Sequence, residues 1–388
     1  MTMQTPIQAV FMRGGTSKGV FFREDWLPSD PAIRERVLLR VIGSPDPYGQ
    51  QIDGMGCGTS STTKVVIVGP ATRDDSDVNY TFGAVAIGDP VIDWSGNCGN
   101  LTSAVGPFAI AQGLVAAPEN GIATVRIWQT NIRARIIARV PMRDGKVVEG
   151  GDFVLDGVTF PAAEIPLEFL QDAAQSEGMF PTGRLIETLD IPGIGPIEAT
   201  LITAGNPAIM VNAATLGLTG AELQADINGN TALLARAEAI RAHCAVAMGL
   251  SKTAAEATEL RPHTPKLAFV SQPRAYVASN GQAVAAEDIQ LNARIFSMGK
   301  LHHAMTGTGA VGLAAAAAIP GTVVSQTMGG PRTALRFGHP SGTLSVGAQT
   351  ALRDGAWAVT SVTMSRSARR LMEGAVLVPE ALLHGGAA

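Results

Sequence analysis

Apolar and polar positions alternate in short runs along much of the chain, a pattern typical of half-buried strands. Apolar residues recur at helical spacing in only a few segments. The first half is expected to be rich in strands, assigned to residues 7–23 as a pair around a glycine loop, to 65–68, to 80–87, and to 124–140 as a second pair. Asp144-Gly145 and Asp156-Gly157 are expected to form hairpin turns.

Helices are expected at residues 31–42, with a proline at the start, and later at 231–249 and 286–297. Between them, residues 198–203 and 209–212 are expected to be strands joined by a loop, AGNPA. Strands and helices are therefore both expected in the chain.

The length of 388 residues favours two domains, and the pattern divides at a polar segment, residues 171–184. We therefore expect domains at 1–184 and 185–388, with the last strand free to pack back on the first domain. One internal similarity supports two halves. The segments beginning at Cys98 and at Ala304 each place a polar, glycine-rich turn before an alanine-rich helix that suits the inside of a curved sheet.

Composition excludes several classes of protein. The chain is 46% hydrophobic and 16% charged, so it can bury a core and is not disordered. A net charge of −4 without a basic block argues against a nucleic-acid partner.

The longest smooth apolar stretch, residues 311–319, is far shorter than the ~18 residues of a membrane-spanning helix. No signal peptide is visible, and three cysteines cannot form a disulfide framework. These features predict a cytoplasmic protein without a membrane partner, in which Cys57 and Cys244 have structural roles. The apolar composition is compatible with a homo-oligomer.

The turn around Cys98 is the first candidate site. A helix beginning near Thr102 would direct free backbone N–H groups toward it, which favours anions and a thiolate. A buried structural cysteine is the alternative. A second turn, residues 302–308, would offer another helix N-terminus, and two such termini suit a substrate with several carboxylates. The paired histidines His302 and His303 lack a third ligand at zinc-like spacing, so no metal is expected.

Lys64 is the second candidate, because it follows a run of hydroxyl side chains at the entry to an apolar strand. A lysine held in a closed site can act as a general base. An exposed surface lysine is the alternative. The loop at residues 13–19 has the wrong order for a phosphate-binding loop, so a carboxylate cradle or a tight hairpin is expected there. A polar glycine loop at 337–342 is expected to line the second half or to form only a turn.

These segments resemble the PrpF family of 2-methylaconitate cis-trans isomerases. The resemblance runs through FMRGGTSKGVFF (11–22), VIGSPDPYGQQIDGMG (41–56), SSTTKVVI (60–67), DWSGNCGNLTSAVGPFAI (93–110), SMGKLHHAM (297–305), RFGHPSGTLSVGAQ (336–349) and MSRSARRLMEG (364–374). It implies an α+β protein with the diaminopimelate epimerase-like fold. In this fold two pseudo-symmetric domains each wrap a β-sheet around a central helix, and the active site lies in the interdomain cleft.

The resemblance implies that Lys64 is the catalytic lysine and Cys98 the active-site cysteine. The resemblance also implies that the glycine and the two asparagines that the family has around this cysteine correspond to Gly99, Asn97 and Asn100. Together with the expected carboxylate-binding loops and helix starts, the substrate-binding residues are Thr16, Ser17, Ser61, Thr62, Asn97, Gly99, Asn100, Met305, Thr306 and Gly307. The resemblance leads us to expect a glycine at position 57, where this chain has Cys57.

The implied activity is cofactor-independent interconversion of trans- and cis-2-methylaconitate, a small tricarboxylate, in propionate breakdown by the methylcitrate cycle. No motif for a metal, nucleotide or flavin is present. A 4-oxalomesaconate tautomerase, which also shifts an allylic proton, is the nearest alternative. An accessory protein paired with an aconitase-type dehydratase is an alternative of another class. An amino-acid epimerase is opposed by Ala304, which stands where a second cysteine would be needed.

Overall fold

The computed structural model describes residues 3–170, 178–353 and 355–384. By its internal contacts the chain divides into two compact units. Within the described residues, unit 1 takes its parts from 1–153, 161–166 and 366–388, and unit 2 from 154–160 and 167–365. The domain boundary at residue 184 stays a prediction, because part of the loop expected there, residues 171–177, lies outside the described residues.

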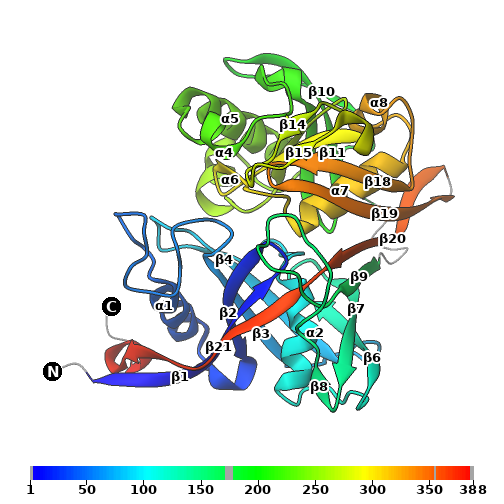
Figure 1. Cartoon of the computed structure of the whole chain (residues 1–388). Helices are drawn as coiled ribbons and strands as arrows, with labels where there is room; N and C mark the ends of the chain where they lie inside the picture. Colours follow the sequence, from blue (N-terminus) through cyan, green and yellow to red (C-terminus); the bar gives the residue numbers. More distant parts are fainter. Residues whose placement is uncertain (1–2, 171–177, 354, 385–388) are drawn as a thin grey trace. The chain divides into compact units, whose positions relative to one another are not determined.

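Unit 1 is built on one curved sheet in which neighbouring strands follow the order β21–β1–β2–β3–β4–β6–β7 (Figure 1). The pairs β2–β3 and β4–β6 are parallel, whereas β1–β2, β3–β4 and β6–β7 are antiparallel. Its strands and short helical turns are β1 (Gln4–Gly14), β2 (Ser17–Arg23), η1 (Glu24–Trp26), β3 (Lys64–Pro70), β4 (Val78–Val85), β5 (Ile92–Asp93), β6 (Gly121–Gln129), β7 (Ala134–Arg143), β8 (Lys146–Val147), β21 (Ala368–Pro379) and η4 (Glu380–His384).

Helix α2 (Thr102–Ala111) lies inside the curve of this sheet. Every residue from Thr102 to Ala109 is buried, and the helix contacts β1, β6, β7 and β21. A helix that is apolar on all sides needs such a position. Gly106 permits the close approach, since a Cβ there would lie 2.9 Å from a methyl group of Val140.

The helix predicted from its spacing is present as α1 (Pro31–Ile42), and it covers the other face of the sheet. The Asp30 side chain caps it by accepting the N–H groups of Ala32 and Ile33, and Gly43 ends it in the left-handed conformation with φ 84°. Its buried residues, among them Leu38, pack against strands and against the C-terminal η4. Burying one such leucine contributes roughly 1.5–3 kcal/mol.

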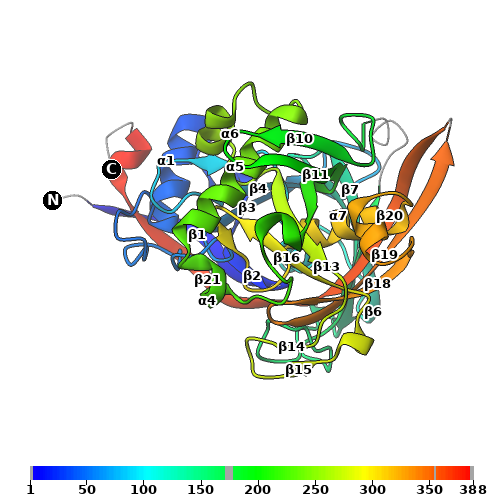
Figure 2. The same ribbon diagram turned by 90° about the horizontal axis from the view of Figure 1, so that it is seen from above.

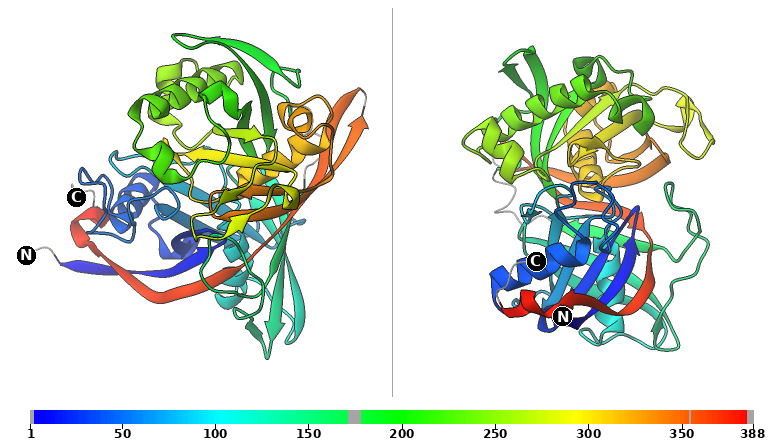
Figure 3. Two further views of the ribbon diagram at one scale, coloured as in Figure 1. Left: turned by 45° about the horizontal axis from the view of Figure 1, so that its top comes forward. Right: turned by 90° about the vertical axis from the view of Figure 1, so that its left-hand side faces the viewer.

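The C-terminal strand β21 pairs with β1 along its length. The register runs from Gln4 opposite Pro379 to Gly14 opposite Ala368. The two ends of the described chain therefore lie side by side in unit 1 (Figure 3).

Unit 2 repeats the same strand order. The antiparallel pair β11–β12 is followed by the parallel pair β12–β13, the antiparallel β13–β16, the parallel β16–β18 and the antiparallel β18–β19. Its strands and short helical turns are β10 (Glu187–Ile191), β11 (Gly195–Ala204), β12 (Asn206–Asn212), η2 (Ala213–Leu216), β13 (Lys266–Ser271), β14 (Tyr276–Val277), β15 (Ala283–Val284), η3 (Ala286–Asp288), β16 (Leu291–Ser297), β17 (Lys300–Leu301), β18 (Ala334–His339), β19 (Gly342–Arg353) and β20 (Ala356–Arg366). Strand β9 (Ile165–Leu170) lies at the passage from unit 1 to unit 2.

Two helices cover opposite faces of this sheet (Figure 2). Successive residues of β12 point in opposite directions, so Ile209 packs in the core with α5, whereas Met210 lies against Gly312 of α7. Helix α7 (Gly307–Ala318) is buried throughout, as α2 is in unit 1. The helices of unit 2 are α4 (Gln224–Asn228), α5 (Thr231–Ala247), α6 (Ala254–Leu260), α7 and α8 (Val323–Thr327).

The expectation of two similar α+β halves, each a sheet wrapped around a helix, is therefore confirmed. The predicted strands at 7–23, 65–68, 80–87 and 124–140 are present with small shifts at their ends. In the described residues no helix has both the length and the apolar character needed to span a membrane.

Three local predictions are wrong. Residues 286–297 form not a helix but the turn η3 followed by strand β16, whose seven residues are all buried. A strand covered on both faces loses its polar–apolar alternation, which hid it from the pattern. The expected AGNPA loop shrinks to Gly205, because β12 already begins at Asn206. Asp156-Gly157 do turn, but one isolated bridge, Phe153 with Ala162, stands where a hairpin was expected.

Candidate functional site

Lys64 is the first residue of β3, and it lies beside the start of the parallel strand β2. Its side chain is buried, with 5% exposed. The Nζ group donates to Ser17 Oγ at 2.9 Å and to Cys98 Sγ at 3.4 Å. Three residues expected in the site from sequence are thus in direct contact, and Lys64 is not an exposed surface lysine.

Cys98 lies at the N-terminus of α2, as predicted. The backbone N–H of Leu101 donates to its Sγ at 3.5 Å, so the positive end of the helix is directed at the sulfur. The Cys98 carbonyl accepts from the N–H and the hydroxyl of Thr102, and also from the Tyr80 hydroxyl at 3.4 Å. Burial raises the pKa of Tyr80 well above its usual value, and Cys98 adds to the rise, so the phenol remains a donor.

The rest of the cysteine turn is fixed by polar contacts. Asn97 accepts from the Thr102 hydroxyl at 3.3 Å, and Gly99 is buried in the same turn. Asn100 Nδ2 donates to Thr16 Oγ1 at 3.0 Å. The β1–β2 turn and the start of α2 are therefore held together by side chains that sequence reasoning placed in one site.

The glycines of the RGGTSKG segment provide space for this contact. Gly15 has φ +50°, and a Cβ on it would lie 2.5 Å from Asn100 Oδ1. A Cβ on Gly19 would lie 2.7 Å from the Lys64 carbonyl oxygen. The segment is a tight turn between β1 and β2 whose backbone approaches Lys64 and Asn100 closely.

Ser61 and Thr62 hold the loop that precedes Lys64. Their hydroxyls both lie within hydrogen-bond distance of the Thr59 hydroxyl, at 3.0 and 2.9 Å. The Ser61 carbonyl accepts the N–H of Lys18 at 3.0 Å, which ties the loop to β2. Their role in binding carboxylates stays a prediction.

Arg366 is a residue of this cluster that sequence reasoning missed. It is buried, with 1% exposed, and its Nε donates to Asn100 Oδ1 at 2.9 Å. Burial lowers the pKa of Arg366 to about 10, and the nearby Cys98 partly offsets the fall, so the guanidinium is charged at neutral pH. In the sequence Arg366 stands in the MSRSARRLMEG segment, where no local spacing indicates a contact with Asn100.

The second predicted helix start is also present, within unit 2. Thr306 caps α7, because its Oγ1 accepts the N–H of Gly309 at 3.2 Å, while Met305 is buried beside it and Gly307 is the first helical residue. Thr308 Oγ1 is buried and has no hydrogen-bond partner in the described part of the chain.

The two neighbouring histidines are built into the turn before α7. His302 Nδ1 accepts the N–H of Ala304 at 3.1 Å, and the His302 and His303 rings stack with their centroids 4.6 Å apart. The predicted binding role of Met305, Thr306 and Gly307 stays untested.

The two other cysteines differ from each other. Cys244 is buried in the core beneath α5, which agrees with a structural role. Cys57 is exposed and packs into no core, so its expected structural role stays a prediction.

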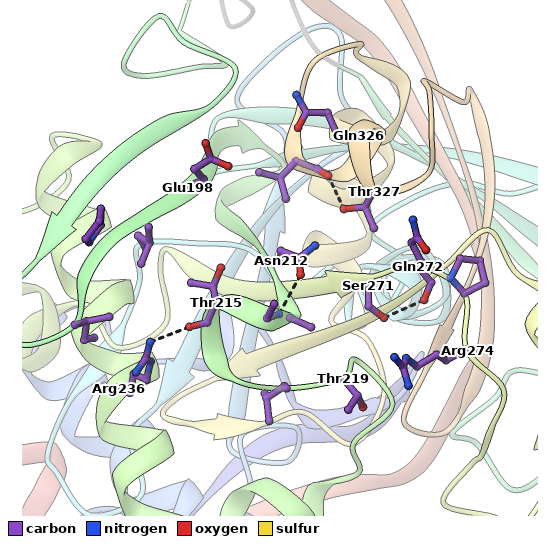
Figure 4. Close-up of a pocket in the computed structure, with 18 residues that line it drawn as sticks. Glu198, Asn212, Thr215, Thr219, Arg236, Ser271, Gln272, Arg274, Gln326 and Thr327 are labelled. Carbon is purple, nitrogen blue, oxygen red and sulfur yellow. Dashed lines mark hydrogen bonds between the residues drawn. The ribbon is translucent and has the colours of Figure 1, made fainter.

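A groove of about 940 Å³ lies elsewhere in unit 2 (Figure 4). Residues from β11, β13, η2 and α8 line it, and Arg236 donates to the Thr215 carbonyl at its edge. None of the site residues expected from the sequence lines this groove. The expected catalytic residues Lys64 and Cys98 therefore lie outside this groove, and their catalytic role stays a prediction.

The chain is similar to known proteins along nearly its whole length. A family model described as PrpF protein matches residues 4–379. Two relatives named 2-methyl-aconitate isomerase, from Shewanella oneidensis and Cupriavidus necator, are each 57% identical over 97% of this chain and 98% of their own length. A relative from Pseudomonas putida named 4-oxalomesaconate tautomerase is 37% identical, with 97% of each chain covered.

Solved structures agree with the fold. A crystal structure of methylitaconate-delta-isomerase matches with a TM-score of 0.74 and 39% identity, covering 99% of this chain and 98% of that chain. A hydroxyproline epimerase from Agrobacterium vitis matches with a TM-score of 0.55 at 14% identity, covering 100% and 97% of the two chains. The second match concerns the fold alone, and it agrees with the epimerase-like architecture expected from the sequence.

Proposed function

The chain belongs to the PrpF family, and on this premise we propose that it is an isomerase that interconverts trans- and cis-2-methylaconitate. The observation that carries the chemistry is the buried contact of Lys64 with Ser17 and Cys98 at the N-terminus of α2. The 57% identity to two relatives of that name supports the choice of substrate.

The substrate has a methylene group that is both allylic and next to a carboxylate. Lys64, as a neutral amine, takes a proton from this carbon, and the electron pair of the broken C–H bond spreads into a dienolate. The former double bond gains single-bond character and rotates. A proton then returns to the same carbon, and the double bond forms again in the other geometry. The reaction needs no external reactant, because each atom removed is replaced.

The positive groups of the cluster stabilise the negative charge of the substrate and the dienolate. The N-terminus of α2 and the Arg366 guanidinium are fixed in place before reaction by Asn100 and by backbone contacts. Ser17 orients the Lys64 amine. The wider set of substrate contacts stays as predicted, namely Thr16, Ser61, Thr62, Asn97, Gly99, Met305, Thr306 and Gly307.

A 4-oxalomesaconate tautomerase uses related chemistry, but the relative of that name is only 37% identical. An accessory protein for an aconitase-type dehydratase would have no need for the Lys64–Cys98 contact. An amino-acid epimerase with two thiols is opposed by Ala304 at the second helix start. Homo-oligomer formation, pairing with a dehydratase and a cytoplasmic location stay predictions.

The test is proton NMR of the purified protein with trans-2-methylaconitate in deuterated buffer. We expect the cis isomer to appear, with deuterium in its methylene group. Conversion of 4-oxalomesaconate at a higher kcat/KM than trans-2-methylaconitate would replace the proposed substrate with the alternative. No conversion of either acid would overturn the isomerase proposal and favour the accessory protein.

A further inference from the structure

The hairpin turn between β18 and β19 is bound to the segment that leads into α7. The two strands pair up to His339 opposite Gly342, so the polar glycine loop at 337–342 forms a hairpin turn. Ser341, in this turn, is buried with 4% exposed, and its hydroxyl donates to the His303 carbonyl oxygen at 2.5 Å. His303 lies directly before the turn at the start of α7, so this bond joins the two turns of unit 2.

The equivalent hairpin of unit 1 is bound in a similar way. It joins β6 to β7, and the Asn131 side chain in its turn donates to the Trp94 carbonyl oxygen at 2.8 Å. Trp94 lies in the segment that leads into the Cys98 turn and α2. In both units a polar side chain of one hairpin turn therefore donates to a backbone carbonyl ahead of the buried helix. The contact occurs twice although the side chains at the starts of the two helices differ.

A long connection in unit 2 supports Ser341 from its other side. Strands β3 and β4 of unit 1 are joined by residues 71–77, whereas β13 and β16 are joined by residues 272–290, which include the pair β14–β15 (Figure 2). The Ser279 N–H donates to the Pro340 carbonyl oxygen at 2.9 Å, and the Ser279 hydroxyl donates to Ser341 Oγ at 3.3 Å. The Ser341 hydroxyl thus accepts one hydrogen bond while it donates the other, which fixes its direction.

Tyr276 of β14 holds the two ends of the β18–β19 turn. Its hydroxyl lies 2.7 Å from the His339 carbonyl oxygen and 2.5 Å from the Gly342 carbonyl oxygen, so one proton is shared between them. Burial raises the pKa of Tyr276 to about 12, although Arg294 lowers it in part, so the phenol remains a donor at neutral pH. Gly338 provides the space, because a Cβ there would lie 2.9 Å from the Tyr276 ring.

Arg294 of β16 fixes Tyr276 against the end of β18. It is completely buried, and it donates to the Glu222 carbonyl at 2.7 Å and to the Gly338 carbonyl at 3.1 Å. Its guanidinium carbon lies 4.8 Å from the centroid of the Tyr276 ring, which is a cation–π contact. Burial lowers the pKa of Arg294 to about 10, and Tyr276 and Glu222 offset part of the fall, so the group is charged at neutral pH. One buried cation thereby joins the loop before α4, the end of β18 and the 272–290 segment.

We propose that Ser341 is a positioning residue of the isomerase, which acts through the His303 carbonyl on the turn that starts α7. Tyr276 holds the Ser341 turn in place for this task. The inference rests on the proposed function and on the predicted binding of substrate carboxylates by residues 305–307. A displacement of about 1 Å in groups that hold a substrate costs on the order of 10²-fold in rate. A side chain that fixes their place therefore contributes to turnover without contacting the substrate.

The first test measures kcat and KM for 2-methylaconitate in Ser341→Ala and Tyr276→Phe. We expect Ser341→Ala to lower kcat/KM by about 10–100-fold, mainly through a higher KM, because the displaced turn binds carboxylates. Tyr276→Phe keeps the Ser341 hydroxyl and only loosens its turn, so its kcat/KM should fall less, by about 3–10-fold. Both side chains act through one turn, so the double variant should lie within about 3-fold of Ser341→Ala.

Each variant has a matched control. Ser345→Ala removes an exposed hydroxyl from β19 of the same hairpin, and Tyr48→Phe changes a tyrosine that is 86% exposed. Both should keep the wild-type kcat and KM. A kcat/KM of Ser341→Ala within 2-fold of the wild type would overturn the inference, even if the thermal midpoint falls, because the contact would then serve stability alone. A loss confined to kcat, with KM unchanged, would also overturn it.

A second measurement needs no substrate. Backbone hydrogen exchange of the full protein, followed by mass spectrometry, reports on the amides at the start of α7. In the structure the N–H groups of Ala304 and Gly309 donate to side chains of this turn, namely His302 and Thr306. Peptides that cover residues 302–310 should exchange faster in Ser341→Ala and Tyr276→Phe than in the wild type, and Ser345→Ala should leave them unchanged.

The two measurements separate the inference from the proposed function. If the wild type isomerises 2-methylaconitate, unchanged exchange in both variants would overturn the inference and leave the function intact. If the wild type does not convert this acid, the proposed function falls. Faster exchange in the variants would in that case still establish the bond between the two turns, whereas its assignment to substrate binding would fall with the function.

Discussion

The starts of α2 and α7 are matching positions in two units that share one strand order, yet their side chains differ. In unit 1 the turn brings Cys98 and Asn100 to Lys64 and Arg366. In unit 2 the turn has Ala304 in place of the cysteine, and the lysine of β13 contacts an imidazole and a hydroxyl. The sheet and buried helix repeat, whereas the reactive groups do not.

This difference separates two kinds of requirement. A helix buried inside a curved sheet requires small apolar residues, and both α2 and α7 have them. Proton transfer requires groups that lose and gain a proton at low cost, and the turn of unit 1 has a cysteine in contact with its lysine where the matching turn of unit 2 has Ala304. A repeated fold therefore does not by itself predict a repeated mechanism.

The largest expected effect is that of Lys64→Ala on activity. Removing the proposed base should lower kcat for 2-methylaconitate isomerisation by about 10²–10⁴-fold, the usual contribution of general acid–base catalysis. Steady-state conversion followed by proton NMR measures this effect. Lys146→Ala, an exposed lysine of the same unit, should be unaffected. A Lys64→Ala enzyme within 10-fold of the wild type would favour the accessory protein.

A smaller effect, on the free energy of unfolding, is expected when a glycine in a tight turn of either unit is replaced by alanine. Gly15 has φ +50°, and a Cβ added to it would lie 2.5 Å from Asn100 Oδ1. Gly205 has φ +78°, and a Cβ added to it would lie 3.0 Å from a methyl group of Val311. Gly145 has φ +69° and open space around it. Alanine should lower the free energy of unfolding by about 3 kcal/mol at Gly15, about 2 kcal/mol at Gly205 and about 1 kcal/mol at Gly145.

Urea unfolding of the three alanine variants measures this series. Gly15→Ala should also lower kcat, because the turn that holds Ser17 is displaced from the start of α2, while Gly145→Ala should not. Equal losses of stability at Gly15 and Gly145 would mean that the contact with Asn100 relaxes without cost, and the cluster would then be less rigid than described.

Arg366→Met tests the part of the cluster contributed by the end of the chain. It leaves Asn100 Oδ1 without its charged donor, which should lower the free energy of unfolding by about 1–3 kcal/mol and kcat by about 10-fold. Arg366→Lys keeps the positive charge but has a different shape, so its kcat should lie between those of the wild type and Arg366→Met. If both variants match the wild type in kcat, Arg366 serves only the packing of unit 1.

The contrast between Lys64 and Arg366 shows how far the sequence could predict this site. Lys64, Cys98 and the start of α2 were predictable because hydroxyl runs, glycines and a helix start are local signals. Arg366 contacts Asn100 across 266 residues of sequence, and the buried Lys266 contacts Ser297 across 31 residues. No local spacing carries such contacts. The helix expected at 286–297 failed for a related reason, because burial on both faces comes from strands distant in sequence.

The smallest expected effect concerns the thiols, and it compares the two units without changing a residue. Alkylation by iodoacetamide at pH 7–9, followed by mass spectrometry, should label Cys57 first, because it is exposed. Cys98 should follow slowly, and bound substrate should protect it. Burial raises the pKa of Cys244 to about 12, although Arg241 lowers it in part, so the thiolate fraction there remains very small across this range. Labelling of Cys244 should therefore be the slowest, and any increase with pH should come from unfolding of α5.

If Cys244 were labelled before Cys98, the core beneath α5 would open more readily than the start of α2. Unit 2 would then be the less stable half.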